Sequence, residues 1–186
     1  MKIAVIDADL LGRRRHRFPN LVCEKISGYY KQVVKLPPEN VVLKTDYEHL
    51  EEFDRVFIAK VFTDTPVPEW LQHVSQPKEL LIRVGRPDAG ALPVEKWLEK
   101  TVGYKINGKI PVNVGGTGFF FDRAPNLPDV IEHCMPDYHL YDNWIEEKVE
   151  QAKKKAECEG REFHRSRFLV QFKEYLEYSI GYLTRG

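Results

Sequence analysis

A glycine-rich turn is the strongest local signal for chemistry in this sequence. Gly115, Gly116 and Gly118 surround Thr117 directly after an apolar segment. Because glycine has no Cβ, such a run lets backbone N–H groups converge on a phosphate or carboxylate. The spacing is neither GxGxxG nor the GK[ST] of a P-loop, and no clear helix start follows it. Two interpretations stay open: an anion-binding loop, or a tight turn between a strand and the next loop.

A basic run lies earlier in the chain, over Arg13-Arg14-Arg15-His16-Arg17. It follows the first apolar segment, which we expect to be a strand. The loop after such a strand lies at the working edge of a doubly wound sheet, where guanidinium groups can bind phosphate. A solvated surface loop explains the same residues equally well.

Four further candidates are defined by their position near the ends of predicted strands: Asp7, Asp9, Lys60 and Thr63. The two aspartates resemble the acidic pair of a phosphoacceptor receiver domain, but Asp64 lies too far along the chain to complete that site. Hydrogen bonding within the loop, or capping of a helix, is the simpler role for the two carboxylates. No residue in the sequence carries a catalytic assignment.

Histidine, aspartate and cysteine residues do not show the spacing of a metal site. A mixed cluster occurs in the segment HCMPDYHLYD, with these members: His133, Asp137, His139 and Asp142. The two histidines are six positions apart across a proline, which matches no standard ligand spacing. Cys23, Cys134 and Cys158 are also widely separated. We therefore predict no metal site and no disulfide framework, and we expect reduced thiols in the cytoplasm.

Alternating strand and helix patterns predict the fold class. Apolar runs predict strands over residues 2–6, 41–43, 55–62, 79–84, 109–114 and 178–183. Helical patterns occur over residues 21–34, 47–53, 94–100, 141–158 and 163–176. Strands that alternate with helices form parallel sheets with right-handed crossovers. We predict an α/β, Rossmann-like fold with a parallel or mixed sheet flanked by helices, a helical C-terminal arm and a final strand.

Composition excludes several classes of function. The 186 residues hold 28 basic and 28 acidic side chains, so the formal net charge is zero. No global basic field points to nucleic acid or to an anionic membrane surface. No apolar run approaches the roughly 20 residues of a spanning helix, and the start MKIAVIDADLLG lacks the pattern of a secretory signal. We expect a cytoplasmic protein without a membrane or nucleic-acid partner.

Several segments together resemble the N-terminal region of a group of radical SAM proteins of uncharacterised function. The matching strings are KIAVIDADLLG, RFPNLVCEKISGYYK, VFIAKVFTDTP, VGGTGFFFDRAPNLPDVIEHCMPDYHLYDNWI and FKEYLEYSIGYLTRG. The last string resembles the segment that leads directly into the CxxxCxxC cluster motif of that family. The resemblance is weakest over residues 87–105.

The resemblance implies a cobalamin-binding-type α/β domain beside a partial barrel that holds an iron–sulfur cluster and S-adenosylmethionine. It implies residues 1–135 as the α/β domain, 136–176 as a helical linker, and 177–186 as the first strand of a truncated barrel. The chain has no CxxxCxxC, so the cluster and S-adenosylmethionine are expected only in a full-length protein. The DxHxxG signature for cobalamin is also missing, because Asp142 occupies the glycine position of Asp137-Tyr138-His139.

The implied role is an accessory domain of a radical SAM enzyme, truncated before its cluster loop and inactive alone. Its partners would be the missing C-terminal barrel and an unknown substrate. The alternative is a freestanding Rossmann-like module that binds a nucleotide or similar anion at the Arg13–Arg17 and Gly115–Gly118 loops. Both interpretations make the glycine-rich turn the first candidate for ligand contact.

Overall fold

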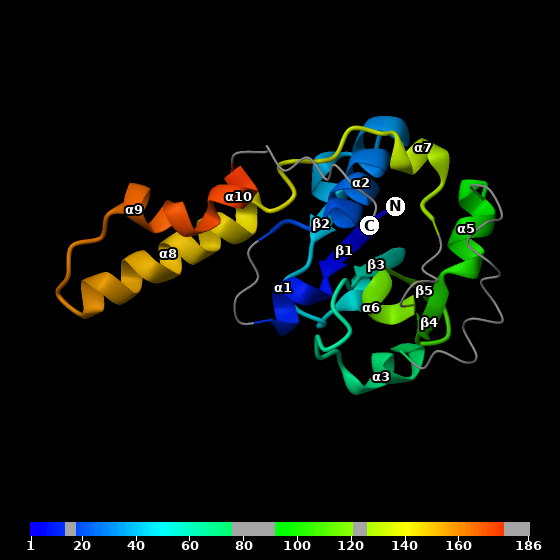
Figure 1. Cartoon of the computed structure of the whole chain (residues 1–186), viewed down its shortest axis with the longest axis horizontal. Coiled ribbons are helices and arrows are strands. Elements are labelled where there is room, and N and C mark those ends of the chain that lie inside the picture. Colours follow the sequence, from blue (N-terminus) through cyan, green and yellow to red (C-terminus); the bar gives the residue numbers. More distant parts are fainter. Residues whose placement is uncertain (14–17, 76–91, 121–125, 177–186) are drawn as a thin grey trace. The chain divides into compact units, whose positions relative to one another are not determined.

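The computed structural model describes residues 1–13, 18–75, 92–120 and 126–176 (Figure 1). The chain divides into two compact units. Unit 1 contains residues 1–16 and 20–137, and unit 2 contains residues 17–19 and 138–186. The strands that the sequence predicts over residues 79–84 and 178–183 lie outside the described residues, as do Arg14, Arg15, His16 and Arg17.

Unit 1 is built on a five-stranded sheet with the strand order β2-β1-β3-β5-β4. The strands are β1 (Ile3–Asp7), β2 (Val41–Leu43), β3 (Arg55–Ala59), β4 (Val102–Ile106) and β5 (Ile110–Gly115). All neighbouring strands run parallel except β4, which is antiparallel to β5. This confirms the predicted α/β, Rossmann-like class with a mixed sheet.

The helices of unit 1 are short, and several are single turns. They are α1 (Ala8–Gly12), α2 (Leu21–Gly28), α3 (Glu69–Gln72), α5 (Val94–Lys100), α6 (Thr117–Phe120) and α7 (Asp129–Glu132). A π-helical turn, Tyr29–Val33, continues α2, and 3-10 turns occur at Pro38–Asn40, Leu50–Glu52 and His73–Ser75. Asn20 begins α2 by accepting hydrogen bonds from the N–H groups of Val22 and Cys23.

The sheet is covered on both faces. On one face, alternate residues of β1, β3 and β5 pack against α3, α6 and nearby turns, with Leu71, Val74 and Phe119 in the core. On the other face, Phe57 of β3 lies between Tyr30 and Trp97, at centroid distances of 5.6 and 6.0 Å. Burial on both faces explains why β1 and β3 read as continuous apolar runs. The buried Asn113 of β5 is an exception on this sheet, and its side chain bonds to Arg55, Leu98 and Thr101.

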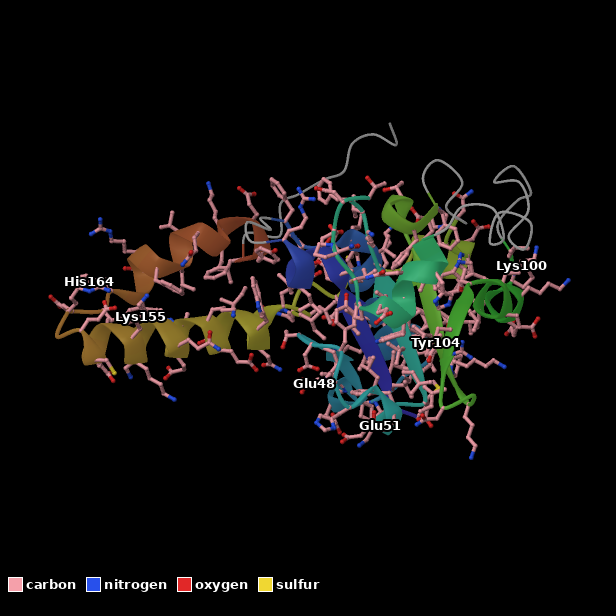
Figure 2. All side chains as sticks on the ribbon, turned by 90° about the horizontal axis from the view of Figure 1, so that it is seen from below. Glu48, Glu51, Lys100, Tyr104, Lys155 and His164 are labelled. Carbon is pink, nitrogen blue, oxygen red and sulfur yellow. The ribbon has the colours of Figure 1, made fainter. Side chains whose placement is uncertain are left out.

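Unit 2 is helical in its described part. It contains α8 (Asp142–Cys158), α9 (Arg165–Leu169), a 3-10 turn (Val170–Phe172) and α10 (Lys173–Leu176). Aromatic rings join α8 to the later turns, because the Trp144 ring lies 5.3 Å from each of the Phe172 and Tyr175 rings. Charged side chains such as Lys155 extend from the exposed face of α8 (Figure 2). No helix in the described part of the chain is both long and apolar enough to cross a membrane.

Several predicted elements differ from the structure. Residues 47–53, expected as a helix, contain only a 3-10 turn at Leu50–Glu52. The run expected as a strand over residues 55–62 leaves the sheet after Ala59, so Lys60 begins a loop. A short helix, α6, begins at Thr117 within the glycine-rich turn, whereas the sequence suggested no helix start there. The Lys60 N–H still donates to the Gly115 carbonyl beside the last register pair, and the chain leaves the sheet at Val61 and Phe62, whose N–H groups donate to the Asp9 carboxylate.

Glu24 is a buried carboxyl group on α2, with 4% of its surface exposed. No hydrogen bond or ion pair of the Glu24 carboxyl is found with the described residues. Burial, and secondarily the charges of Asp137 and Asp7, raise the pKa of Glu24 from 4.5 to about 7. The folded protein therefore holds the proton of Glu24 over a pH range in which the unfolded chain has lost it.

Glu24→Gln is expected to remove a pH dependence of folding stability. Because the folded pKa lies above the unfolded one, the wild-type free energy of unfolding falls as the pH rises from about 4.5 to about 7. The variant should exceed the wild type by about 3 kcal/mol at pH 8 and match it near pH 4. Urea titrations across this range measure the difference. The exposed Glu48→Gln is the matched control, and equal pH profiles for Glu24→Gln and the wild type would contradict the assignment.

Candidate functional site

Three parallel strands end side by side in unit 1. Asp7 at the end of β1 pairs in register with Ala59 of β3, and Ala59 pairs with Gly115 of β5. The segments that follow these residues therefore start at one edge of the sheet. In open α/β sheets, ligands bind beyond this carboxyl edge.

Asp7 begins the first of these segments by capping α1. Its side chain accepts hydrogen bonds from the N–H groups of Asp9 and Leu10, at 3.1 and 3.3 Å. Asp7 is fully buried. Capping is one of the two roles, loop hydrogen bonding or helix capping, that the sequence predicts for these carboxylates, and α1 in turn directs Asp9 toward the loop after β3.

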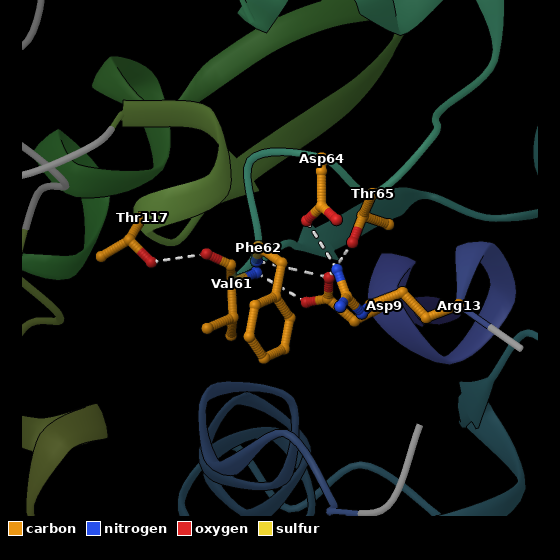
Figure 3. Close-up of polar contacts among 7 residues, drawn as sticks. All are labelled: Asp9, Arg13, Val61, Phe62, Asp64, Thr65 and Thr117. Carbon is orange, nitrogen blue, oxygen red and sulfur yellow. Dashed lines mark hydrogen bonds and ion pairs between the residues drawn. The ribbon is translucent and has the colours of Figure 1, made fainter. Parts of the chain in front are cut away.

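Asp9 holds the loop after β3 in place. Its buried carboxylate accepts hydrogen bonds from the N–H of Val61 at 2.6 Å and of Phe62 at 3.3 Å, and also from the hydroxyl of Thr65 (Figure 3). Both carboxylate oxygens are used. Hydrogen bonds to a buried charge are among the stronger polar interactions in proteins, so this loop is well fixed.

Arg13 holds the same loop from its exposed side. Its guanidinium bonds to Asp64 at 2.6 Å and lies 4.2 Å from the ring centroid of Phe62 (Figure 3). Phe62 is 47% exposed, so this contact is at the surface. The structure thus connects the first residue of the basic run to the carboxyl edge.

The glycine-rich turn wraps around the backbone of Lys60. The Lys60 N–H donates to the carbonyl of Gly115 at 3.0 Å, and the N–H of Gly118 donates to the carbonyl of Lys60 at 2.9 Å. The hydroxyl of Thr117 donates to the carbonyl of Val61 at 2.8 Å. Gly116 has a φ of +96°, and a Cβ there would overlap the Lys60 carbonyl oxygen. The turn therefore packs closely on Lys60, and the N–H of Gly118 is used in a hydrogen bond within the protein.

Lys60 has the least usual surroundings at this edge. It is 3% exposed, yet its ammonium has no hydrogen bond or ion pair with any described residue. The Nζ atom lies 5.4 Å from the ring centroid of Phe119. Burial lowers the pKa of Lys60, and the nearby charges of Asp9 and Asp64 oppose that shift. A cation on a side chain this buried, without a hydrogen-bonded partner among the described residues, is costly unless something else compensates it.

Two residues near the edge are not indicated by the sequence. Thr65 binds Asp9, whereas the predicted candidate Thr63 lies exposed in the adjacent turn. Tyr47, which follows β2, has a buried hydroxyl without a hydrogen-bond partner among the described residues. Burial, followed by the charges of Asp7 and Asp9, raises the pKa of Tyr47. Only its position after a strand could have singled it out.

The His/Asp cluster is spread over ordinary contacts. Asp137 accepts hydrogen bonds from Ser27 and Lys31 at 2.6 Å each. His133 contacts the carbonyl of Asp129, and His139 pairs with Asp142 at the surface of unit 2. Among the residues that the structure describes, no group of three potential metal ligands is found. All three cysteines are free thiols.

Comparisons with protein-family models, with curated proteins and with solved structures found no significant match to this chain. Any function must therefore be argued from the carboxyl edge itself.

Gly116→Ala is expected to lower the free energy of unfolding by about 2 kcal/mol, because it combines a positive φ with an overlap on the Lys60 carbonyl. Gly115→Ala is the matched control. A Cβ at Gly115 meets no atom within 4 Å, so that change should cost less than about 0.5 kcal/mol. Equal losses in the two variants, measured by urea unfolding, would show that the turn is not closely packed on Lys60.

Proposed function

We propose that unit 1 is a Rossmann-like module that binds a small anionic ligand, such as a nucleotide, at the carboxyl edge of β1, β3 and β5. The observation that carries this proposal is the buried ammonium of Lys60, which no described residue neutralises. A carboxylate or phosphate oxygen would supply the missing partner.

The surroundings of Lys60 support an external partner over an internal one. The charge of Asp9 acts on Lys60, but the Asp9 oxygens already accept three hydrogen bonds from the loop. Asp64 is paired with Arg13. The chain next to Lys60 is at the surface, because Val61 and Phe62 are 46% and 47% exposed. A small ligand could therefore approach the edge without disturbing the core.

The glycine-rich turn has an indirect role in this proposal. The N–H of Gly118 is bonded to Lys60, which differs from a loop whose free N–H groups surround a phosphate. The turn instead fixes the lysine that would contact the anion. The proposed setting is the cytoplasm, where the three free thiols stay reduced.

The test is a thermal-shift panel of inorganic phosphate, AMP, ATP and S-adenosylmethionine with the purified chain. A ligand present at 100 times its Kd should stabilise the fold by about 2.7 kcal/mol. Lys60→Met keeps most of the apolar stem and removes the charge, so it should lower the affinity for that ligand by at least about tenfold.

The matched control is Lys109→Met, an exposed lysine in the hairpin between β4 and β5. It should leave the shift unchanged. A flat response to every anion, or equal responses from the wild type and Lys60→Met, would contradict the proposal.

A second proposal keeps the role that the resemblance implies: an accessory domain of a radical SAM enzyme that binds substrate beside a C-terminal barrel. The α/β unit followed by a helical unit is compatible with that organisation. This second proposal is compatible with the first, because an anion bound at the carboxyl edge would be the substrate of the enzyme. Sequencing the encoding DNA past codon 186 tests it. An in-frame CxxxCxxC would support this role, and a stop codon would contradict it.

A further inference from the structure

The Lys60 side chain occupies a position in which a neutral amine is easier to accommodate than an ammonium ion. Its stem packs on Gly118, where a Cβ would overlap the lysine Cγ, and its Nζ faces the Phe119 ring. The two carboxylates in the described part of the chain whose charges act on it are engaged, Asp9 by the loop and Asp64 by Arg13. Removing a charge from water without a hydrogen-bonded partner is unfavourable, and losing the proton relieves much of that penalty.

We propose that the Lys60 amine is a nucleophile that forms a reversible imine with a small carbonyl compound whose carboxylate is next to the carbonyl carbon. The proposal rests on the ligand-binding function given above, because the same edge must admit that molecule. It adds the chemical class of the ligand, an aldehydo or 2-oxo acid, and a covalent step.

The step is balanced without any further reactant. The lone pair of Nζ attacks the carbonyl carbon and gives a carbinolamine. The nitrogen loses a proton, the former carbonyl oxygen leaves as water, and a C=N bond replaces the C=O bond. Protonation of the product nitrogen gives an iminium ion, and the charge of Asp9 nearby favours this cation.

The lowered pKa of Lys60 agrees with this assignment, because only the free amine is nucleophilic. Desolvation by apolar neighbours is a usual way in which proteins activate lysine. The carboxylate of the ligand lies one bond from the carbonyl carbon. It would therefore remain beside the iminium cation and offset its charge.

The probe is glyoxylate, the smallest compound of this class, with sodium cyanoborohydride to trap the imine as carboxymethyl-lysine. Peptide mass spectrometry after brief labelling at neutral pH compares each lysine of the folded chain. Lys60 should be labelled several-fold faster than the exposed Lys109, because its lowered pKa leaves more of the amine unprotonated at neutral pH. Unfolding in urea should abolish the difference. Propionaldehyde, which lacks the carboxylate, should show a smaller preference for Lys60.

Labelling of Lys60 no faster than that of Lys109 in the folded protein would overturn the inference. The same result would leave anion binding intact if phosphate or AMP still gave a thermal shift that Lys60→Met removes. Conversely, selective labelling of Lys60 without any anion-induced shift would contradict anion binding and retain the nucleophile. Equal selectivity for propionaldehyde and glyoxylate would overturn the assigned ligand class.

Discussion

The carboxyl edge of unit 1 depends on one buried carboxylate. Asp9 accepts three hydrogen bonds from the loop after β3, and so joins segments 52 to 56 positions apart in the sequence. Because Asp9 is fully buried, water does not compete for these donors. Loss of the carboxylate would leave two backbone N–H groups and a hydroxyl to find other partners. The geometry of Lys60, which precedes the first of these donors, follows from that attachment.

The glycine-rich turn also constrains the backbone of Lys60. Its N–H and carbonyl are bonded to Gly115 and Gly118, so both backbone polar groups are satisfied by the glycine-rich turn. The positive φ of Gly116 brings the turn close enough for these bonds. The backbone of Lys60 is thus fixed between α1 and α6, and its side chain extends toward Phe119. The glycines therefore allow the backbone of the turn to lie close to the backbone of Lys60.

Sequence patterns predicted the parts of the fold in which one physical requirement dominates. β1 and β3 are buried on both faces, so their apolar runs identified them. β4 was not predicted, because an edge strand that is only partly buried carries a weak pattern at Val102, Tyr104 and Ile106. The capping role of Asp7 was predicted from local spacing. The roles of Thr65 and Tyr47 could not be predicted, because these residues interact with residues that are distant in the sequence.

The position of Lys60 in the sequence was not enough to predict that its side chain is buried. The run RVFIAKVF predicted a strand that would continue through Phe62. In such a strand, nothing would distinguish Lys60 from the other lysines of the chain. The strand instead ends at Ala59, and Gly118 and Phe119 of α6 pack on that lysine. On stability grounds an apolar side chain of the same length suits this position better, since it needs no partner. A buried polar group that conflicts with local packing is typical of a functional site, and here the conflict lies at the edge where such folds bind their ligands.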